Sequence, residues 1–256
     1  MEKKSNDDQN FKPSIQYFLL FSCFSLGIAW AGGTLFSDDF EGDTVGKEAS
    51  LWELAGGAPG KGSKVVQDPL DPSNKVIFVN SPKWVGGLPE GAWAPKDQSY
   101  LKWTDYTFEG DFMVDDPTKL FAFNYRARDY DNMMHYNVRR WNKGIVGVYT
   151  REKAEWTGAV KEIQHPTKEN VWYTAQVDVK GDHHVFKIKE ATDETDFAKI
   201  DPLIEEEVKG TKLDGGTVQV MCYGFADNII VYVDFKDVEI RNKLTTTWAQ
   251  IRRINE

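Results

Sequence analysis

Residues 106–149 hold a series of short segments in which apolar and polar side chains alternate. In YTFEGDFMV (106–114), Phe108 and Phe112 fall on one side of an extended chain, and Glu109 and Asp111 fall on the other. A period of two is typical of a pleated strand with one buried face. Charged, turn-forming residues separate three further segments of this kind: LFAFNYRAR (120–128), MMHYNV (133–138) and IVGVY (145–149). We therefore predict that the whole region forms an antiparallel meander.

The same alternation returns in three later regions, at 172–189, 217–222 and 229–240. Shorter strands are expected at 34–40 and 76–80. An all-β chain of this length is predicted to form a two-sheet antiparallel sandwich, since single all-β domains often reach 200–250 residues. The acidic segment 190–213 interrupts the strand rhythm, and one helical turn is expected at 203–208.

The first 31 residues resemble a secretory signal peptide. Lysines precede an apolar run from Ile15 to Ala31, and Ala29 and Ala31 supply the small residues that a signal peptidase requires. An uncleaved anchor and a lipid attached to Cys23 remain alternatives. We predict a secreted, periplasmic or extracellular protein with no membrane span in its mature form.

The mature chain is expected to hold a sandwich domain at 32–241 and a tail at 242–256. In the tail, Trp248, Ile251 and Ile254 are three residues apart, which predicts a short helix. The formal net charge of the whole chain is −9. An acidic chain without a basic stripe is not expected to bind nucleic acid. We expect a monomer.

Five segments carry a resemblance to a known family. Their order resembles the concanavalin A-like jelly-roll superfamily and, within it, laminin G-like domains of the 3-keto-disaccharide hydrolase type. The resemblance covers most of 34–241 and implies a jelly-roll sandwich. The segments are LFSDDFEGDTVG with the following Trp52, YTFEGDFMV, FAFNYRARDYDNMMHYNV, WYTAQVDVKGDHHVFKI and DFKDVEIR.

The chain also departs from the pattern of its catalytic relatives. Hydrolase-type relatives commonly carry N-S-G before the F-x-R strand and Y-E-x-Q after it, where this chain has DPTKLFAFNYR and MHYNVRR. The E-x-D-x-x-E strand of laminarinase-like enzymes is represented only by Glu109-Gly110-Asp111. A glycosidase requires two carboxylates across the scissile bond, and the sequence does not identify such a pair. Whether the protein is an enzyme stays open, and a non-catalytic role is favoured.

A ligand-binding face is predicted on the strands of the meander. Asn124 and Arg126 alternate with aromatic residues, so they are expected on the open side of the sheet, with Glu109 and Asp111 beside them on an adjacent strand. The resemblance implies that Arg126 reaches a glycan, whereas pairing of Arg126 with Glu109 or Asp111 is the structural alternative. The predicted binding residues are Glu109, Asp111, Asn124, Arg126, His135, Tyr136 and Trp141.

A calcium site is predicted where an acidic turn follows the first strand. Asp39, Glu41 and Asp43 crowd this turn, and Asp234 belongs to the last strand, which often runs beside the first in jelly rolls. Carboxylate oxygens are the ligands that Ca²⁺ prefers. A solvated acidic turn without metal is the alternative.

Three functions follow from these features. The first is a secreted domain that binds carbohydrate without cleaving it, since loop tryptophans can stack on sugar rings as well as plug a sheet edge. The second is a glycoside hydrolase of the 3-keto-disaccharide hydrolase type, which rests on the resemblance alone. The third is a structural or adhesive extracellular domain.

Overall fold

The computed structural model describes residues 33–55, 63–80, 84–85, 88–89, 92–97, 101–141 and 143–233. The predicted signal peptide, the tail at 242–256 and the calcium ligand Asp234 lie outside these residues. Within them, no helix is long and apolar enough to cross a membrane.

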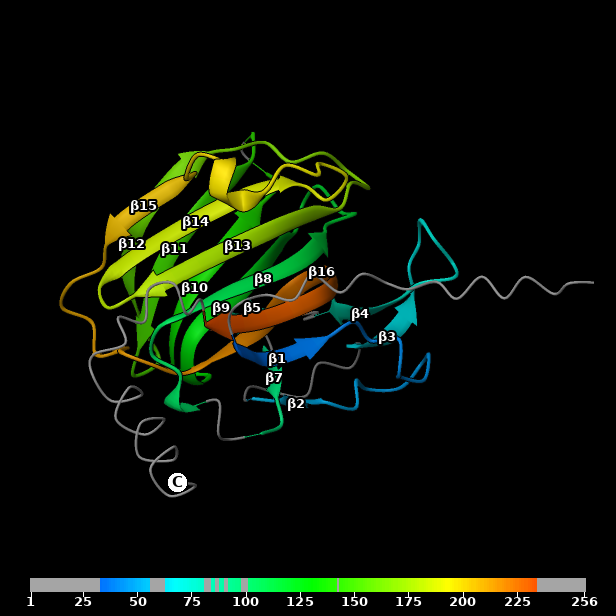
Figure 1. The fold of residues 1–256 in the computed structure, drawn as a ribbon, viewed down its shortest axis with the longest axis horizontal. Coiled ribbons are helices and arrows are strands. Elements are labelled where there is room, and N and C mark those ends of the chain that lie inside the picture. The colour runs from blue at the N-terminus through cyan, green and yellow to red at the C-terminus, as the bar shows by residue number, and fades with distance from the viewer. Residues whose placement is uncertain are drawn as a thin grey trace, which may run out of the picture. The chain divides into compact units, whose positions relative to one another are not determined.

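The regular secondary structure of the described chain is almost all strand (Figure 1). Sixteen strands follow one another, and a 3₁₀ turn at Phe197–Lys199 precedes the fifteenth. Their bounds are β1 (Gly33–Asp38), β2 (Trp52–Leu54), β3 (Lys64–Gln67), β4 (Lys75–Asn80), β5 (Trp84–Val85), β6 (Leu88–Pro89), β7 (Ala92–Pro95), β8 (Tyr106–Met113), β9 (Leu120–Asp129), β10 (Asn132–Arg139), β11 (Ile145–Glu152), β12 (Glu155–Gln164), β13 (Tyr173–Lys180), β14 (His183–Glu190), β15 (Ile204–Glu207) and β16 (Thr217–Val233).

Fourteen of the strands form two antiparallel sheets that share β16, and β5 and β6 pair with each other apart from these sheets. The first sheet has the order β15-β14-β13-β8-β16, with β1 and β4 along the far side of β16 and β3 beyond β4. The second sheet has the order β12-β11-β10-β9-β16-β7-β2. The predicted all-β, two-sheet antiparallel jelly-roll sandwich is therefore confirmed.

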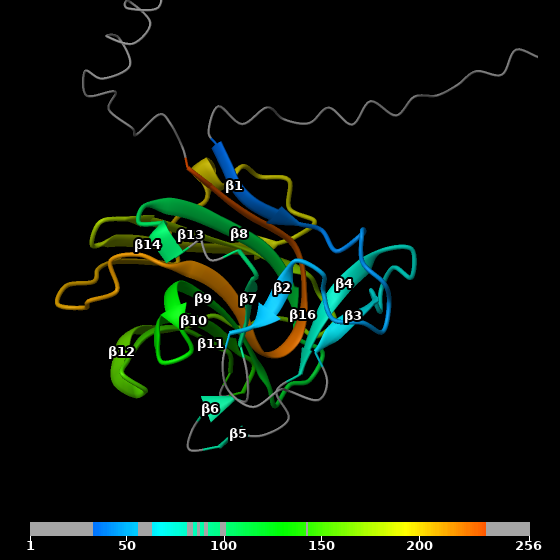
Figure 2. The ribbon, with the colours of Figure 1, turned by 90° about the horizontal axis from the view of Figure 1, so that it is seen from below.

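Strand β16 belongs to both sheets. Residues 217–222 pair with β9 in the second sheet, and residues 223–233 pair with β4, β8 and β1 in the first. The chain turns between the two layers at Cys222 and Gly224, whose φ angles are +79° and +142° (Figure 2). A side chain at position 224 would place its Cβ 2.6 Å from the Met113 carbonyl oxygen, so only glycine fits this corner.

The core lies between the sheets and is rich in aromatic rings. Phe108 of β8 meets Phe123 of β9 with ring centroids 4.8 Å apart, and Phe112 stacks on Phe121 at 5.5 Å. Strands β8 and β9 therefore face each other across the core instead of pairing in one sheet. The predicted meander over 106–149 is wrong at this point, because it begins at β9 and runs through β10 and β11 to β12.

A second correction concerns the acidic segment before β16. The helical turn expected at 203–208 is the edge strand β15, which pairs with β14. Ile204 and Val208 are buried there and join the core cluster. The buried face of an edge strand explains the apolar residues that suggested a helix.

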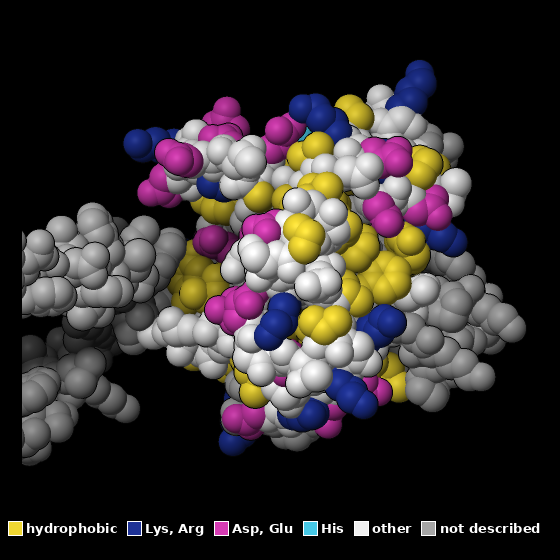
Figure 3. All heavy atoms as spheres, turned by 90° about the vertical axis from the view of Figure 1, so that its right-hand side faces the viewer, with side chains coloured by type: hydrophobic (Ala, Val, Ile, Leu, Met, Phe, Trp, Pro, Cys, Tyr) yellow, Lys and Arg dark blue, Asp and Glu magenta, His cyan; other side chains and the backbone are white. Residues whose placement is uncertain are grey.

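Charges of both signs are interspersed on the surface. In the view from the right-hand side of Figure 1, basic and acidic side chains surround a strip of exposed hydrophobic ones (Figure 3). The described residues of this face form no basic stripe.

Candidate functional site

A row of side chains runs across the outer face of the second sheet, on the side away from the core. The register places Gln219 of β16 opposite Asn124 of β9, Asn124 opposite His135 of β10, and His135 opposite Tyr149 of β11. At the other end, Ala94 of β7 lies opposite Glu53 of β2. These residues alternate with core residues along each strand, so all of them face outward.

Hydrogen bonds fix the middle of this row. Asn124 Nδ2 donates to Gln219 Oε1 at 2.9 Å, and Asn124 Oδ1 lies 2.7 Å from His135 Nδ1. Because Asn124 presents its carbonyl oxygen to the imidazole, His135 Nδ1 carries the proton and Nε2 is the acceptor. Burial, reinforced by Arg139 and Arg151, lowers the pKa of His135 to about 3. The ring therefore stays neutral in one tautomer at physiological pH.

Arg139 and Asn137 lie beside His135 on the same strand and the same face. Arg139 Nε donates to Asn137 Oδ1 at 3.1 Å, and one terminal nitrogen of the guanidinium lies 3.0 Å from Glu162 Oε1 of β12. The guanidinium also donates to the Tyr149 hydroxyl and stacks on the Tyr149 ring, 4.9 Å from its centroid. These contacts hold the donors of Arg139 in one position.

Gly147 of β11 makes room for the Tyr149 ring. A Cβ at position 147 would lie 2.7 Å from the ring, so the tyrosine lies directly over the glycine. The Tyr149 ring therefore lies between the Gly147 backbone on one side and the Arg139 guanidinium on the other. A larger residue at 147 would lift the Tyr149 ring and move Arg139 with it.

Trp156 of β12 forms a wall beside His135. Its ring is 5.0 Å from the imidazole in an edge-on arrangement, and the indole is only partly buried. Arg151 packs behind it, 5.7 Å from the Trp156 ring and 4.9 Å from the Tyr130 ring, with a 2.8 Å ion pair to Asp131. An indole held in this way offers a fixed apolar surface next to polar donors and acceptors.

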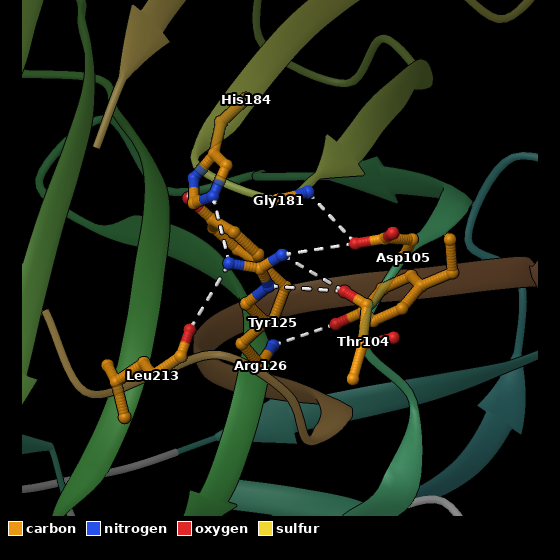
Figure 4. A network of polar contacts seen from close by, with 8 residues as sticks. Thr104, Asp105, Tyr125, Arg126, Gly181, His184 and Leu213 are labelled. Atoms are coloured by element: carbon orange, nitrogen blue, oxygen red, sulfur yellow. Dashed lines mark hydrogen bonds and ion pairs between the residues drawn. The ribbon is translucent and has the colours of Figure 1, made fainter. Parts of the chain in front are cut away.

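Arg126 does not reach this face. Its φ of +46° marks a bulge in β9, where the pairing register with β10 and β16 shifts. The bulge turns the side chain into the interior of the sandwich, where it is 2% exposed (Figure 4). The expectation that Arg126 projects onto the open side of the sheet is wrong, because strict alternation fails at a bulge.

The buried guanidinium of Arg126 instead ties together three segments. It donates to the Thr104 carbonyl oxygen at 3.0 and 3.3 Å, donates to the Leu213 carbonyl oxygen at 3.3 Å and contacts His184 Nε2 at 3.3 Å. Asp105 completes the group with an ion pair at 3.6 Å and accepts the Gly181 N–H at 2.9 Å. The network joins the segment before β8, the turn between β13 and β14 and the segment before β16 (Figure 4).

Glu109 and Asp111 lie on the opposite side of the molecule from Asn124. They project from the outer face of the first sheet, because β8 and β9 belong to different sheets. Glu109 accepts hydrogen bonds from Tyr232 at 2.6 Å and Gln176 at 2.8 Å. Asp111 accepts from Thr174 and Asn228. The prediction that they share a face with Arg126 and Asn124 is wrong.

The remaining predicted residues also divide between surface and core. Tyr136 points into the core, where it is 1% exposed and stacks on Phe186 at 5.2 Å, so its expected place on the binding face is wrong. Trp141 packs against a small cluster that includes Ala122 and Met221, beyond the polar row. Of the predicted set, Asn124 and His135 lie together in the row.

Sequence reasoning missed four residues around His135: Asn137, Arg139, Tyr149 and Gln219. Trp156 was considered among the loop tryptophans that could stack on a sugar, whereas it lies in β12. The signal for two of the four was present, because Asn137 and Arg139 follow His135 at intervals of two and must share its face. Residues of β12 and β16 could not be found in this way, because the alternation of apolar and polar residues within a strand does not show which other strand it pairs with.

The predicted calcium ligands lie in the turn after β1. Asp43 Oδ2 is buried and has no protein partner among the described residues, which fits a cation. However, Lys75 Nζ donates to the main-chain oxygens of Glu41 and Asp43, and so brings a positive charge to the same turn. No group of three or more His, Cys, Asp or Glu among the described residues is arranged to hold a metal. Since Asp234 lies outside them, the calcium site stays a prediction.

Comparisons with known proteins show similarity of structure only. No protein-family model and no curated protein matches the chain. The chain is similar to a carbohydrate binding module, CBM66 from Bacillus subtilis, with 13% sequence identity and a TM-score of 0.48. The match covers 72% of this chain and 94% of the module. Chicken galectin 2 has 12% identity and a TM-score of 0.42, and the match covers 52% of this chain and 94% of the galectin. A toad ovary galectin in complex with thio-digalactose has 15% identity and a TM-score of 0.40, and the match covers 52% of this chain and 92% of the galectin.

Similarities at this level do not assign a ligand or a site. They also do not show that the chain belongs to the 3-keto-disaccharide hydrolase type. The function has to be argued from the polar row and its aromatic wall.

Proposed function

We propose that the protein binds carbohydrate on the outer face of the second sheet, around His135, Asn137, Arg139 and Trp156. A pyranose or furanose ring offers neighbouring hydroxyls on its edge and C–H groups on its face. The site offers matching groups, with a fixed acceptor and fixed donors on the sheet and an indole beside them.

The observation that carries this proposal is the 2.7 Å contact between His135 Nδ1 and Asn124 Oδ1, from which the tautomer of His135 follows. With its Nδ1–H committed to Asn124, Nε2 can accept a hydrogen bond from a sugar hydroxyl. Arg139, held by Glu162 and Tyr149, can donate to the oxygen of the same or the next hydroxyl. Because the partners are already in place, little conformational entropy is lost on binding.

Trp156 supplies the apolar half of the interaction. An indole beside a row of polar groups is a suitable surface for the C–H face of a sugar, and aromatic side chains contribute large contact area at low entropic cost. The orientation of Trp156 against His135 would place the sugar edge over β10 and its face against β12.

The alternative, a glycoside hydrolase, has less support from the groups around His135. A glycosidase needs two carboxylates, one as acid and one as nucleophile or base. Glu162 is the carboxylate in contact with Arg139, and its Oε1 is engaged in that ion pair. Export through the segment 1–31, a monomeric state and a structural Ca²⁺ belong to the same proposal as expectations from the sequence.

A glycan array with the purified full-length chain tests the proposal, followed by calorimetry with the strongest ligand. Trp156→Ala and Arg139→Met should each weaken binding about tenfold or more, corresponding to roughly 1.4 kcal/mol. His183→Ala is the matched control, because His183 lies exposed on the β13–β14 hairpin, where it contacts Glu205 and Glu207 of β15. Equal binding by the Trp156 and Arg139 variants and the unchanged protein would refute the site. An array with no glycan bound would refute the function.

A further inference from the structure

A cavity of about 570 Å³ lies beside the end of β1, the turn that follows β1 and the middle of β16. Here β1 and β16 pair in the first sheet, whereas the groups around His135 lie on the second. The carboxylates of Asp38, Asp39 and Asp43 line the cavity, and Leu51 and Ile230 are among its apolar lining residues. A ligand of this cavity is therefore independent of the glycan proposed for the second sheet.

Hydrogen bonds hold two of the carboxylates in place without neutralising them. Asp38 accepts from Trp52 Nε1 at 2.7 Å and from the Phe40 N–H at 2.9 Å, and Asp39 accepts from the Glu41 N–H at 3.2 Å. The indole and the main-chain amides are uncharged donors. They orient the carboxylate oxygens and leave their negative charge to be balanced by another group.

Asp43 has a buried oxygen without a donor. Its side chain is 8% exposed, its Oδ1 accepts the Ser50 N–H at 3.0 Å, and its Oδ2 has no hydrogen-bond partner among the described residues. A buried charged acceptor without a donor is costly. Since Asp43 lines the cavity, a ligand with a cationic N–H donor would remove this cost.

Two lysines lie near the turn, but their ammonium groups bind main-chain oxygens. Lys75 Nζ donates to the main-chain oxygens of Glu41 and Asp43, at 2.7 and 2.9 Å, and Lys96 Nζ donates to that of Ser50 at 2.7 Å. Neither lysine is among the described residues that line the cavity. Within this lining, three carboxylates are accompanied by no lysine or arginine.

Further negative charge lies behind the cavity, on β8 and β16. Asn228 lines the cavity, and its Nδ2 donates to Asp111 at 2.9 Å and to Asp227 at 3.4 Å. Burial raises the pKa of Asp227 to about 6, and the charges of Asp111 and Asp39 act in the same direction. The acidic surroundings therefore extend from the turn after β1 to the middle of β16.

The size and the lining of the cavity favour an organic cation over a single ion. A volume of this order is typical of a small-molecule site, and a metal ion alone would not contact the apolar residues. We propose that the cavity binds a small primary alkylammonium ion. The carboxylates of Asp39 and Asp43 hold its ammonium group, and Leu51 and Ile230 contact its carbon chain. Ca²⁺, which the sequence predicts for the same turn, is the competing occupant.

Nuclear magnetic resonance on the full-length ¹⁵N-labelled chain, depleted of Ca²⁺ beforehand, tests the proposal. The Trp52 indole N–H donates to Asp38 and reports on the cavity, and the Trp156 indole N–H reports on the second sheet. Butylammonium chloride is the probe. Sodium chloride matches its charge without the carbon chain, and 1-butanol matches the chain without the charge. We expect butylammonium alone to shift the Trp52 resonance in a saturable way and to leave the Trp156 resonance in place.

Three variants complete the test. Asp43→Asn and Asp39→Asn should each weaken butylammonium binding about tenfold, because a charge-assisted hydrogen bond is lost. Asp39 is exposed, so Asp39→Asn keeps the fold even if the buried Asp43 variant does not. Glu194→Gln removes the same charge from an exposed segment between β14 and the 3₁₀ turn and should have no effect.

Four results would overturn the proposal. They are a Trp52 resonance that butylammonium leaves unshifted, an equal shift with sodium or 1-butanol, a shift with added Ca²⁺ but not with butylammonium, and equal butylammonium affinity for Asp39→Asn and Glu194→Gln. None of them bears on glycan binding around His135, which the array tests separately.

Discussion

Replacement of Arg126 by alanine should destabilise the fold strongly. The guanidinium is 2% exposed and donates to the Leu213 carbonyl oxygen in the interior and to the Thr104 carbonyl oxygen in a partly exposed segment. The variant would leave both oxygens and His184 Nε2 without their donor. A buried polar group that loses its partner costs about 1–3 kcal/mol, so about 2 kcal/mol for the Leu213 oxygen and about 1 kcal/mol for the partly exposed Thr104 oxygen give roughly 3 kcal/mol. The ion pair to Asp105 adds little, because Asp105 is largely exposed.

Thermal unfolding followed by circular dichroism measures this effect. For a domain of this size, 1 kcal/mol corresponds to a change of about 2–4 °C in Tm, so the variant should melt roughly 6–12 °C lower. Arg128→Ala is the control two residues away. Its side chain is half exposed and pairs with an exposed Asp214, so its Tm should change by about 2 °C or less. Equal Tm values for the two variants would refute the argument, as would loss of glycan binding by a folded Arg126 variant.

Three further predictions follow from other sites. Gly147→Ala should weaken glycan binding about tenfold with a smaller effect on stability, because a Cβ at this position displaces the Tyr149 ring beneath Arg139. Calorimetry with the ligand found on the array measures the affinity, and an unchanged affinity would contradict the prediction. Burial raises the pKa of Asp227 to about 6, against 3.8 in the unfolded chain, so the folded state binds more protons and the contribution of Asp227 to stability falls as pH rises from about 4 to 6. In urea unfolding, Asp227→Asn should remove this part of the pH dependence, and a variant that keeps the same pH dependence would contradict the prediction. If the turn at Asp43 binds calcium, a chelator should lower Tm and added Ca²⁺ restore it, whereas an unchanged melting curve removes the metal.

The class of fold could be predicted from the sequence, because alternation is a local property. Phe108, Phe112, Phe121 and Phe123 are spaced as strand residues, and all four fill the core. Alternation does not say which sheet a strand joins. Strands β8 and β9 were therefore assigned to one sheet, although their aromatic residues meet face to face across the core.

The site was predictable only in part, for the same reason. His135 and Asn124 were found because each lies on a strand whose opposite face is apolar. Arg126 was misplaced because one residue with positive φ breaks the alternation, and an arginine gives no local signal that it will adopt such a conformation. Glu109 and Asp111 were placed correctly on the surface, but on the wrong side of the molecule.

The shared strand β16 has a consequence for synthesis of the chain on the ribosome. It is the last of the described strands to emerge, yet it is the partner of β9 and β7 in one sheet and of β8, β4 and β1 in the other. Until it emerges, β8 and β9 each lack a neighbour, and their exposed edges can pair with other chains. Closure of both layers in one late step depends on contacts that are distant in sequence, which predicts slow folding after release and a period in which a nascent chain needs a chaperone.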